Sequence, residues 1–510
     1  MKKFLILVLA AMMLLPCVSA FAEYDTQVFF TVCTTKTESA GDYNSDGLAQ
    51  YFKEKFNLDY EVWPVANDSH DEKVRVWVNS QSMPTMTNWA NWNYSEYLDY
   101  VDQGLIGGLP EGWEEKYPNL LHMIEMTGLK DALTVDGTLY AIPNAVFGVF
   151  LNMEHITGHQ TTWYRKDWAK QLGYDFGDTT TFSDFKAFLK DCIDKDMSGT
   201  GTTYGLVAAT DWVNNFFFDS VGIDYDNWME TEDSMVWAPT MDGYKDILAM
   251  MREWYQEGLI YPDYYNLATG EVIDYLTTGQ CAAMRTSGPV SGHVNVYNGF
   301  KKNGIDPEEA YGYTLITGDD GVAHSMETTN FWTIILFNPD TDAETMDRCC
   351  ALIDFLCSEG GIVTCQMGVP GVEWEYDADG KPTYLDAAKA EDGSVIGPYD
   401  RNPSYRVWRQ LGMLSDDFNF VSPAYPTWVQ EACLHAYEVK SKADVVPYNY
   451  DYFLYSSETK NIFSVDISGA VTAIVIGQDD IDTAWDKFIE DNAGMWKPLL
   501  DELNATYFSK

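Results

Sequence analysis

The most constraining stretch of this sequence is the aromatic-rich segment at residues 161–206, TTWYRKDWAKQLGYDFGDTTTFSDFKAFLKDCIDKDMSGTGTTYGL. Its first half carries two tryptophans before Gly173, and glycine commonly ends helices because it tolerates positive φ. Residues 181–184 then supply helix-start side chains ahead of an apolar pattern of helical spacing. The segment therefore predicts two short amphipathic helices on either side of a turn.

The N-terminus has the three parts of a secretory signal: Lys2 and Lys3, an apolar stretch at residues 4–15, and Ala-Phe-Ala at 20–22. The apolar stretch is shorter than the ~20 residues that cross a bilayer. We expect a signal peptide at 1–22, cut after Ala22, and an exported protein that is periplasmic or secreted. Cys17 offers the alternative of a lipidated cell-surface protein, but Pro16 replaces the small residue expected before such a cysteine.

The first unit after the signal is predicted to be a strand, a helix and a strand. Residues 28–33 are apolar, residues 48–56 carry apolar side chains at helical spacing, and Tyr60 and Val62 alternate with charged neighbours. In parallel sheets, ligands bind beyond the carboxyl ends of strands. The loop before the helix therefore makes Asn44 a ligand-binding candidate, with helix capping as the alternative role.

The formal net charge of −46 narrows the possible partners. Such a field repels phosphate backbones and anionic membranes, so no nucleic-acid partner is expected. An uncharged ligand fits best. The cysteines beyond the signal show no regular framework, and we expect buried or free thiols.

Several motifs resemble one family. The run DG-x-x-Y-A-I-P at residues 136–143 is followed by Y-R-x-D-W, L-G, T-F-x-D-F and D-x-D-x-x-G-x-x-x-T-Y-G-L. This order is similar to extracellular solute-binding protein family 1, the receptors of ABC importers that include maltose-binding proteins and long oligosaccharide-binding lipoproteins. Further stretches match in the same order over nearly the whole mature chain.

The resemblance implies an α/β fold of the two-lobed periplasmic-binding-protein type (type II), with interleaved lobes and a ligand cleft between them. It places lobe 1 at residues 23–143 plus 328–368 and lobe 2 at residues 144–327 plus 369–510. The chain would cross between the lobes near residues 143–147, near 327–332 and after Gly368.

Sugar binding needs flat aromatic faces and planar polar side chains, and both are concentrated in TNWANWNYSEY. This stretch follows a predicted strand and aligns with a sugar-contacting loop of the family. It makes ligand-binding candidates of four residues: Asn88, Trp89, Asn91 and Trp92. Ordinary core packing is the alternative role of each aromatic ring.

The same reasoning selects candidates elsewhere. ATDWVNNFFFDS places an acid and an aromatic after a strand-like run, TSGPV opens a helix in the family, and METTNFW is a hinge candidate. The ligand-binding candidates from these stretches and from the first crossing are Asp211, Trp212, Ser287, Asn330, Trp332 and Phe147.

No metal, cofactor or catalytic residue is predicted. The loop from Asp194 begins like an EF-hand, but its twelfth position is Gly205, where such a loop normally has a bidentate glutamate. A capped structural turn is therefore expected, with a calcium site as the alternative. Motifs of serine hydrolases, zinc proteases and nucleotide-binding loops do not occur.

The sequence thus favours a monomeric substrate-binding protein of an ABC transporter. It would capture a neutral oligosaccharide between its lobes and deliver it to membrane permease subunits. The alternatives are a secreted carbohydrate-active enzyme of the glycoside hydrolase type, for which 78 acidic residues allow many carboxylate pairs, and a sensor that passes its ligand to a signalling kinase.

Overall fold

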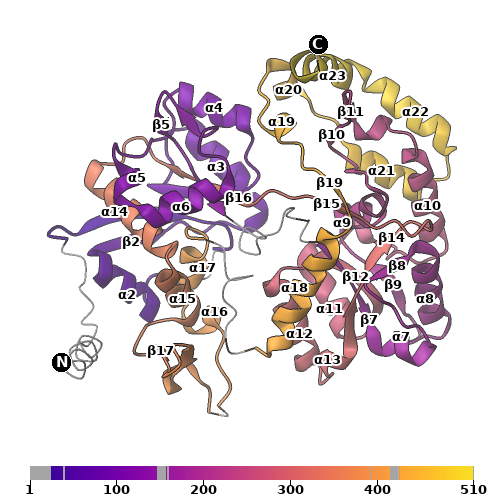
Figure 1. Cartoon of the computed structure of the whole chain (residues 1–510), viewed down its shortest axis with the longest axis horizontal. Helices are drawn as coiled ribbons and strands as arrows, with labels where there is room; N and C mark the ends of the chain where they lie inside the picture. The colour runs from indigo at the N-terminus through magenta and orange to yellow at the C-terminus, as the bar shows by residue number, and fades with distance from the viewer. Residues whose placement is uncertain are drawn as a thin grey trace, which may run out of the picture.

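The computed structural model describes residues 24–37, 41–145, 157, 160–391, 393–413, 423 and 425–508. These residues form two α/β lobes that lie side by side (Figure 1). The predicted signal peptide, Cys17 and Phe147 lie outside the described residues.

Lobe 1 is built on a five-stranded mixed sheet. Its strands follow the order β2 (Leu58–Val62), β1 (Val28–Cys33), β3 (Met86–Trp89), β16 (Phe331–Phe337) and β6 (Ile142–Ala145). Strand β1 runs parallel to β2 and β3, whereas β16 runs antiparallel to β3 and β6. The helix α2 (Gly47–Phe56) joins β1 to β2, so the strand–helix–strand unit expected from the sequence is present.

Helices and short hairpins complete lobe 1. They are α3 (His70–Asn79), α4 (Tyr94–Asp102), α5 (Trp113–Lys116), α6 (Pro118–Thr127), α14 (Ala343–Leu356), α15 (Glu359–Met367), α16 (Pro398–Arg401) and α17 (Tyr405–Trp408), with the pairs β4 (Thr134–Val135)–β5 (Thr138–Leu139) and β17 (Trp374–Tyr376)–β18 (Pro382–Tyr384).

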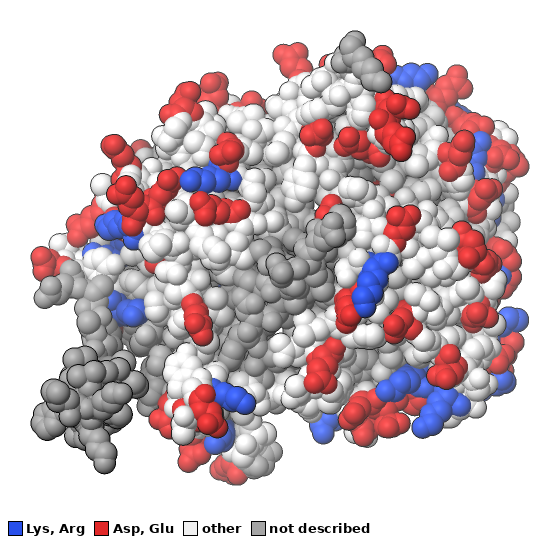
Figure 2. Space-filling view, viewed as in Figure 1, with Lys and Arg blue, Asp and Glu red and all other residues white. Residues whose placement is uncertain are grey.

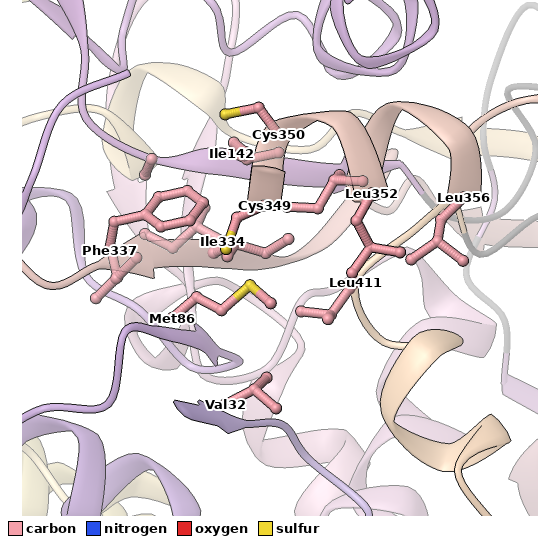
Figure 3. Close-up of a cluster of buried hydrophobic side chains, with 14 of the residues drawn as sticks. Val32, Met86, Ile142, Ile334, Phe337, Cys349, Cys350, Leu352, Leu356 and Leu411 are labelled. Atoms are coloured by element: carbon pink, nitrogen blue, oxygen red, sulfur yellow. The ribbon is translucent and has the colours of Figure 1, made fainter. Parts of the chain in front are cut away.

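The core of lobe 1 lies between its sheet and α14. Met86 and Ile334 come from neighbouring strands and share a buried cluster with Cys349 and Leu352 of α14 (Figure 3). The eight cysteines of the described residues are free and buried, which confirms the expectation from the sequence. Burial raises the pKa of the Cys350 thiol to about 12, so this thiol stays protonated at neutral pH.

Lobe 2 contains a four-stranded sheet in the order β13 (Tyr311–Tyr313), β7 (Gln160–Arg165), β12 (Cys281–Ser287) and β9 (Tyr204–Val207). The two helices predicted from the opening segment are α7 (Lys166–Leu172) and α8 (Phe182–Asp194). Gly173 ends α7 at a φ of 88°, and the Thr181 hydroxyl accepts a hydrogen bond from the Asp184 amide at the start of α8. Both predicted helix boundaries are confirmed.

Further elements of lobe 2 flank this sheet or pack on the helices beside it. The helices are α9 (Thr210–Phe218), η3 (Asp219–Val221), α10 (Tyr244–Gln256), α11 (Val272–Thr277), α12 (Val290–Lys302), α13 (Pro307–Ala310), α18 (Thr427–Ser441), α19 (Tyr450–Phe453), α20 (Glu458–Ile462), α21 (Ile467–Ile476), α22 (Ile481–Asp491) and α23 (Ala493–Tyr507). The strand pairs are β8 (Thr179–Thr181)–β14 (Leu315–Thr317), β10 (Trp228–Glu230)–β11 (Met235–Trp237) and β15 (His324–Met326)–β19 (Asp444–Val446).

The crossings between the lobes lie at the ends of these elements. The first falls between β6 and β7, and the second between β15 and β16. The third differs from the sequence prediction, which placed it after Gly368. Trp408 of α17 packs against Phe52 and Tyr60 of lobe 1, with ring centroids 5.2 and 4.7 Å apart. The chain therefore belongs to lobe 1 as far as Met413, because residues of this stretch bury the aromatic side chains of α2 and β2.

Candidate functional site

A polar cavity of about 180 Å³ opens in lobe 2 beside the second crossing. Its lining comes from several elements, chiefly β7, η3, β12, β15 and α18, and from the residues that lead toward lobe 1. The lining residues are Gln160, Asn215, Asp219, Ser220, Asp224, Arg285, Leu315, His324, Ser325, Met326, Glu327, Thr328, Lys440 and Tyr448.

Arg285 holds one wall of the cavity together. Its guanidinium donates to the Asp219 carboxylate, to Gln160 Oε1 at 3.0 Å and to Thr162 Oγ1 at 3.3 Å. The side chain is nearly buried and lies on the central strand β12, with β7 as its neighbour. A buried guanidinium with several acceptors is fixed in one orientation.

Lys440 reaches the same wall from α18. Its ammonium group donates to the backbone oxygen of Gln160 and lies 3.4 Å from Thr161 Oγ1. Burial, together with repulsion by Arg285, lowers the pKa of Lys440 to about 7. The cavity therefore contains a second cation whose charge depends on pH near neutrality.

Three acidic residues line the same cavity. Glu327 Oε2 accepts the backbone N–H of Tyr448 at 3.0 Å, and Asp224 Oδ2 accepts from Asn227 at 2.9 Å. Together with Asp219, these acids give the cavity both donors and acceptors in fixed positions. Such a lining can bind a neutral molecule that carries several hydroxyl groups, because each hydroxyl both donates and accepts.

The ligand-binding candidates of lobe 2 lie on α9 and β12, two elements that also contribute residues to the cavity. Asp211 and Trp212 begin α9, and Asp211 Oδ1 accepts from Tyr225 at 2.8 Å and from Ser468 at 2.6 Å. Trp212 remains partly exposed, so its indole retains accessible surface. Ser287 ends β12, two residues beyond Arg285, and is also partly exposed.

Trp89 requires a correction. The sequence made it a stacking candidate, but its indole has no exposed surface and stacks on Tyr100, with centroids 5.6 Å apart. It lies opposite Ile334 in the sheet, and Arg75 covers its ring at 5.3 Å. A fully enclosed ring offers no face to a ligand in this conformation, so the structure assigns Trp89 to the core of lobe 1.

The three asparagine candidates of lobe 1 are engaged in internal hydrogen bonds. Asn88 is buried and accepts from the Thr35 amide at 2.9 Å, and Asn44 donates to the backbone oxygen of Tyr60 at 2.6 Å. Asn91 is exposed, and its side chain donates to Asp71 at 2.5 Å. The structure places these three side chains in separate contacts within lobe 1.

The candidates at the second crossing lie closer together. Trp92 packs against Phe331, with centroids 5.8 Å apart, and only 7% of its surface is exposed. Asn330 precedes this phenylalanine and donates to the Met126 carbonyl at 2.5 Å. Trp332 follows it and is partly exposed, so it retains surface that a ligand could contact.

Sequence reasoning missed the charged residues of the cavity. Arg285 carried a usable signal, because a charge inside the strand CAAMRTS is unusual in a buried segment. No comparable sequence signal marks Asp219, Lys440 or Tyr448, because each belongs to an ordinary polar or amphipathic stretch.

The loop from Asp194 is closed by its own hydrogen bonds. The Asp196 carboxylate accepts from the Gly201 amide at 2.8 Å and from the hydroxyls of Ser198 and Thr203, both at 3.0 Å. Among the described residues, no group of three or more His, Cys, Asp or Glu side chains is arranged to hold a metal ion.

In the part of the chain that the structure describes, no single helix is long and apolar enough to cross a membrane. Helices α14 and α15 pass that test only as a pair, by length and composition, and they are bent by 83° at their junction.

Comparisons with known proteins agree with this architecture. Residues 135–362 match the family model described as bacterial extracellular solute-binding protein. None of the curated proteins compared with the chain matches it by sequence.

Solved structures resemble the chain over nearly its full length. The alginate-binding protein AlgQ2, without calcium ion, is 16% identical at a TM-score of 0.69, and the match covers 96% of this chain and 100% of that one. FusA of S. pneumoniae in complex with kestose is 16% identical at a TM-score of 0.69, with 95% and 99% covered. NgtS, an N-glycan transport solute-binding protein of Streptococcus pneumoniae, is 16% identical at a TM-score of 0.61, with 94% and 98% covered.

At these identities the structures show the fold alone. The model of the bacterial extracellular solute-binding protein family thus matches residues 135–362, and the solved structures share the two-lobed α/β fold over nearly the whole chain.

Proposed function

We propose that the protein binds a neutral oligosaccharide between its lobes and that the cavity beside Arg285 receives part of this ligand. The observation that carries the proposal is the mixed lining of the cavity, which contains Arg285 and Lys440 together with Asp219, Asp224 and Glu327. Fixed donors and acceptors match hydroxyl groups. Trp332 at the second crossing and Trp212, on the same helix as the cavity residue Asn215, each keep a partly exposed ring that supplies an apolar face.

The ligands of similar structures support a saccharide. FusA was solved with kestose, and NgtS was solved with Man5GlcNAc. AlgQ2 binds alginate, but the net charge of −46 and the carboxylates of the cavity disfavour a polyanion here. On the face shown in Figure 2, acidic side chains are spread over both lobes.

The family model that matches residues 135–362 describes extracellular solute-binding proteins, and FusA is an ABC-transporter substrate-binding protein. For this chain we propose export with cleavage after Ala22, action as a monomer in the periplasm or as a secreted protein, and delivery of the sugar to permease subunits. Ligand that contacts both lobes would stabilise the closed state, and recognition of that state would couple binding to transport.

Calorimetric titration of the mature protein with a panel of neutral oligosaccharides tests this proposal, with oligoalginate as the charged comparison. We expect saturable binding of at least one neutral sugar and none of oligoalginate. Asn215→Ala removes an amide from the cavity and should weaken binding, whereas the exposed Asn295→Ala on α12 should not. Failure of every neutral sugar to bind would reject the proposed ligand class.

A further inference from the structure

A short segment of lobe 2 packs against the core of lobe 1. We call residues 448–453 the bridging segment; it comprises Tyr448, Asn449 and α19. The preceding strand β19 pairs with β15 of lobe 2. Asn449 donates to the Trp228 carbonyl of lobe 2 at 2.9 Å and accepts from the Tyr452 amide at 2.8 Å, which caps α19. The segment is therefore anchored to lobe 2.

The end of this segment nevertheless packs on lobe 1. The Phe453 ring meets Trp92 edge-on, with centroids 5.0 Å apart and an interplanar angle of 87°. It also lies 5.4 Å from Phe331, the first residue of β16. Phe453 thus adds a side-chain contact between the lobes directly beside the second covalent crossing.

The beginning of the segment lines the polar cavity. Tyr448 is one of the cavity residues, and its backbone N–H donates to Glu327. Its ring lies 5.0 Å from Tyr450 and 6.0 Å from Phe453. The cavity wall and the contact with lobe 1 are therefore two ends of one packed aromatic group.

Lys460 holds the segment in shape. Its ammonium group donates to three backbone oxygens, those of Tyr452 at 2.6 Å, Phe453 at 3.0 Å and Tyr455 at 2.8 Å, and the side chain is 8% exposed. A cation at the C-terminal end of a helix satisfies carbonyls that lack helical partners. Displacement of Tyr448 would consequently move α19 as a unit rather than unravel it.

We propose that the bridging segment couples occupation of the cavity to the position of lobe 1. A ligand that contacts Tyr448 or Glu327 fixes the start of the segment, and the rigid α19 then holds Phe453 between Trp92 and Phe331. The coupling is reciprocal, so seating of Phe453 also organises the cavity for the ligand. Phe453 is a positioning residue and does not touch the ligand. This inference depends on the proposed function in one respect only, the assumption that the ligand is a neutral oligosaccharide.

Phe453→Ala tests the coupling, and Phe463→Ala is the matched control. Phe463 packs against Trp228 and Trp237 within lobe 2, with centroids 5.6 and 6.1 Å apart. Calorimetry with the sugar that wild type binds should show about tenfold weaker affinity for Phe453→Ala and unchanged affinity for Phe463→Ala. Phe453→Leu keeps most of the apolar volume and should fall between wild type and Phe453→Ala.

A measurement without ligand separates failure of this inference from failure of the proposed function. Hydrogen exchange of the unliganded proteins should be faster at residues 92–97 in Phe453→Ala than in wild type, and unchanged there in Phe463→Ala. Unchanged exchange at these residues overturns the inference even if sugars bind. If no sugar binds wild type, the proposed ligand class fails, and the exchange result alone decides whether the segment couples the lobes.

Discussion

Trp89 stacks on Tyr100 inside lobe 1, with ring centroids 5.6 Å apart and an interplanar angle of 30°. Tyr100 also donates to Glu96 at 2.6 Å, and Arg75 donates to the same carboxylate while covering the Trp89 ring. This arrangement joins β3, α4 and α3, which explains why a tryptophan at the end of a strand serves packing here.

Replacement of Trp89 should therefore reduce stability. Trp89→Ala removes a fully buried indole, and losses of this kind cost about 3–5 kcal/mol. Urea unfolding of wild type and Trp89→Ala measures the difference. A variant as stable as wild type that binds sugar more weakly would return Trp89 to the binding site.

Replacement of Trp212 should reduce ligand affinity. Its indole is partly exposed at the start of α9, and loss of an aromatic contact with the ligand should weaken affinity by about 2 kcal/mol, roughly thirtyfold. Calorimetric titration of Trp212→Ala measures this. Trp496→Ala is the control, because Trp496 packs against Trp237 at the far helices of lobe 2. Equal affinities in both variants would remove Trp212 from the proposed site.

Stability should rise with pH above about 7 because of Lys440. Burial lowers its pKa from 10.5 to about 7 in the folded protein. Between these values the folded protein has released the proton while the unfolded chain retains it. Unfolding then takes up a proton, so the free energy of unfolding increases with pH by up to ~1.4 kcal/mol per unit.

Urea unfolding of wild type and Lys440→Met in the alkaline part of this window measures the contribution of Lys440, because the neighbouring Asp219, whose pKa burial raises to about 7, is ionised there in wild type. Wild type should gain stability relative to the variant as the pH rises. A difference that stays constant with pH would contradict the lowered pKa.

Calcium should not stabilise the protein. The Asp196 carboxylate is already occupied by the Gly201 amide and two hydroxyls, and Gly205 lies where a bidentate glutamate is needed. The melting temperature should be the same with excess calcium and with a chelator. A clear rise with calcium that Asp196→Ala abolishes would show a working site.

The mature N-terminus should begin at Glu23. Ala20 and Ala22 suit a signal peptidase, whereas Pro16 disfavours the processing that leads to lipidation at Cys17. Mass spectrometry of the protein recovered from its native host identifies the N-terminal residue. A diacylated Cys17 would instead make the protein membrane-anchored.

Local features of the chain were readable from the sequence because their causes are local. Gly173 adopts a φ of 88° and ends α7, and the Thr181 hydroxyl starts α8, as the spacing of these residues predicts. The apolar periodicity of the first unit likewise gave β1, α2 and β2. Capping and periodicity act within a few residues, and no distant partner is needed to specify them.

Only the tertiary structure decided which aromatic rings are enclosed and which polar groups meet. Trp89 and Trp212 each lie beside polar residues near the end of a strand. Tyr100 and Arg75 cover the ring of Trp89 and bury it, whereas the ring of Trp212 stays partly exposed. Arg285 and Lys440 both donate hydrogen bonds to Gln160, which lies 125 and 280 positions earlier in the chain. Burial and pairing depend on which elements the fold brings together, and neither spacing nor composition encodes that.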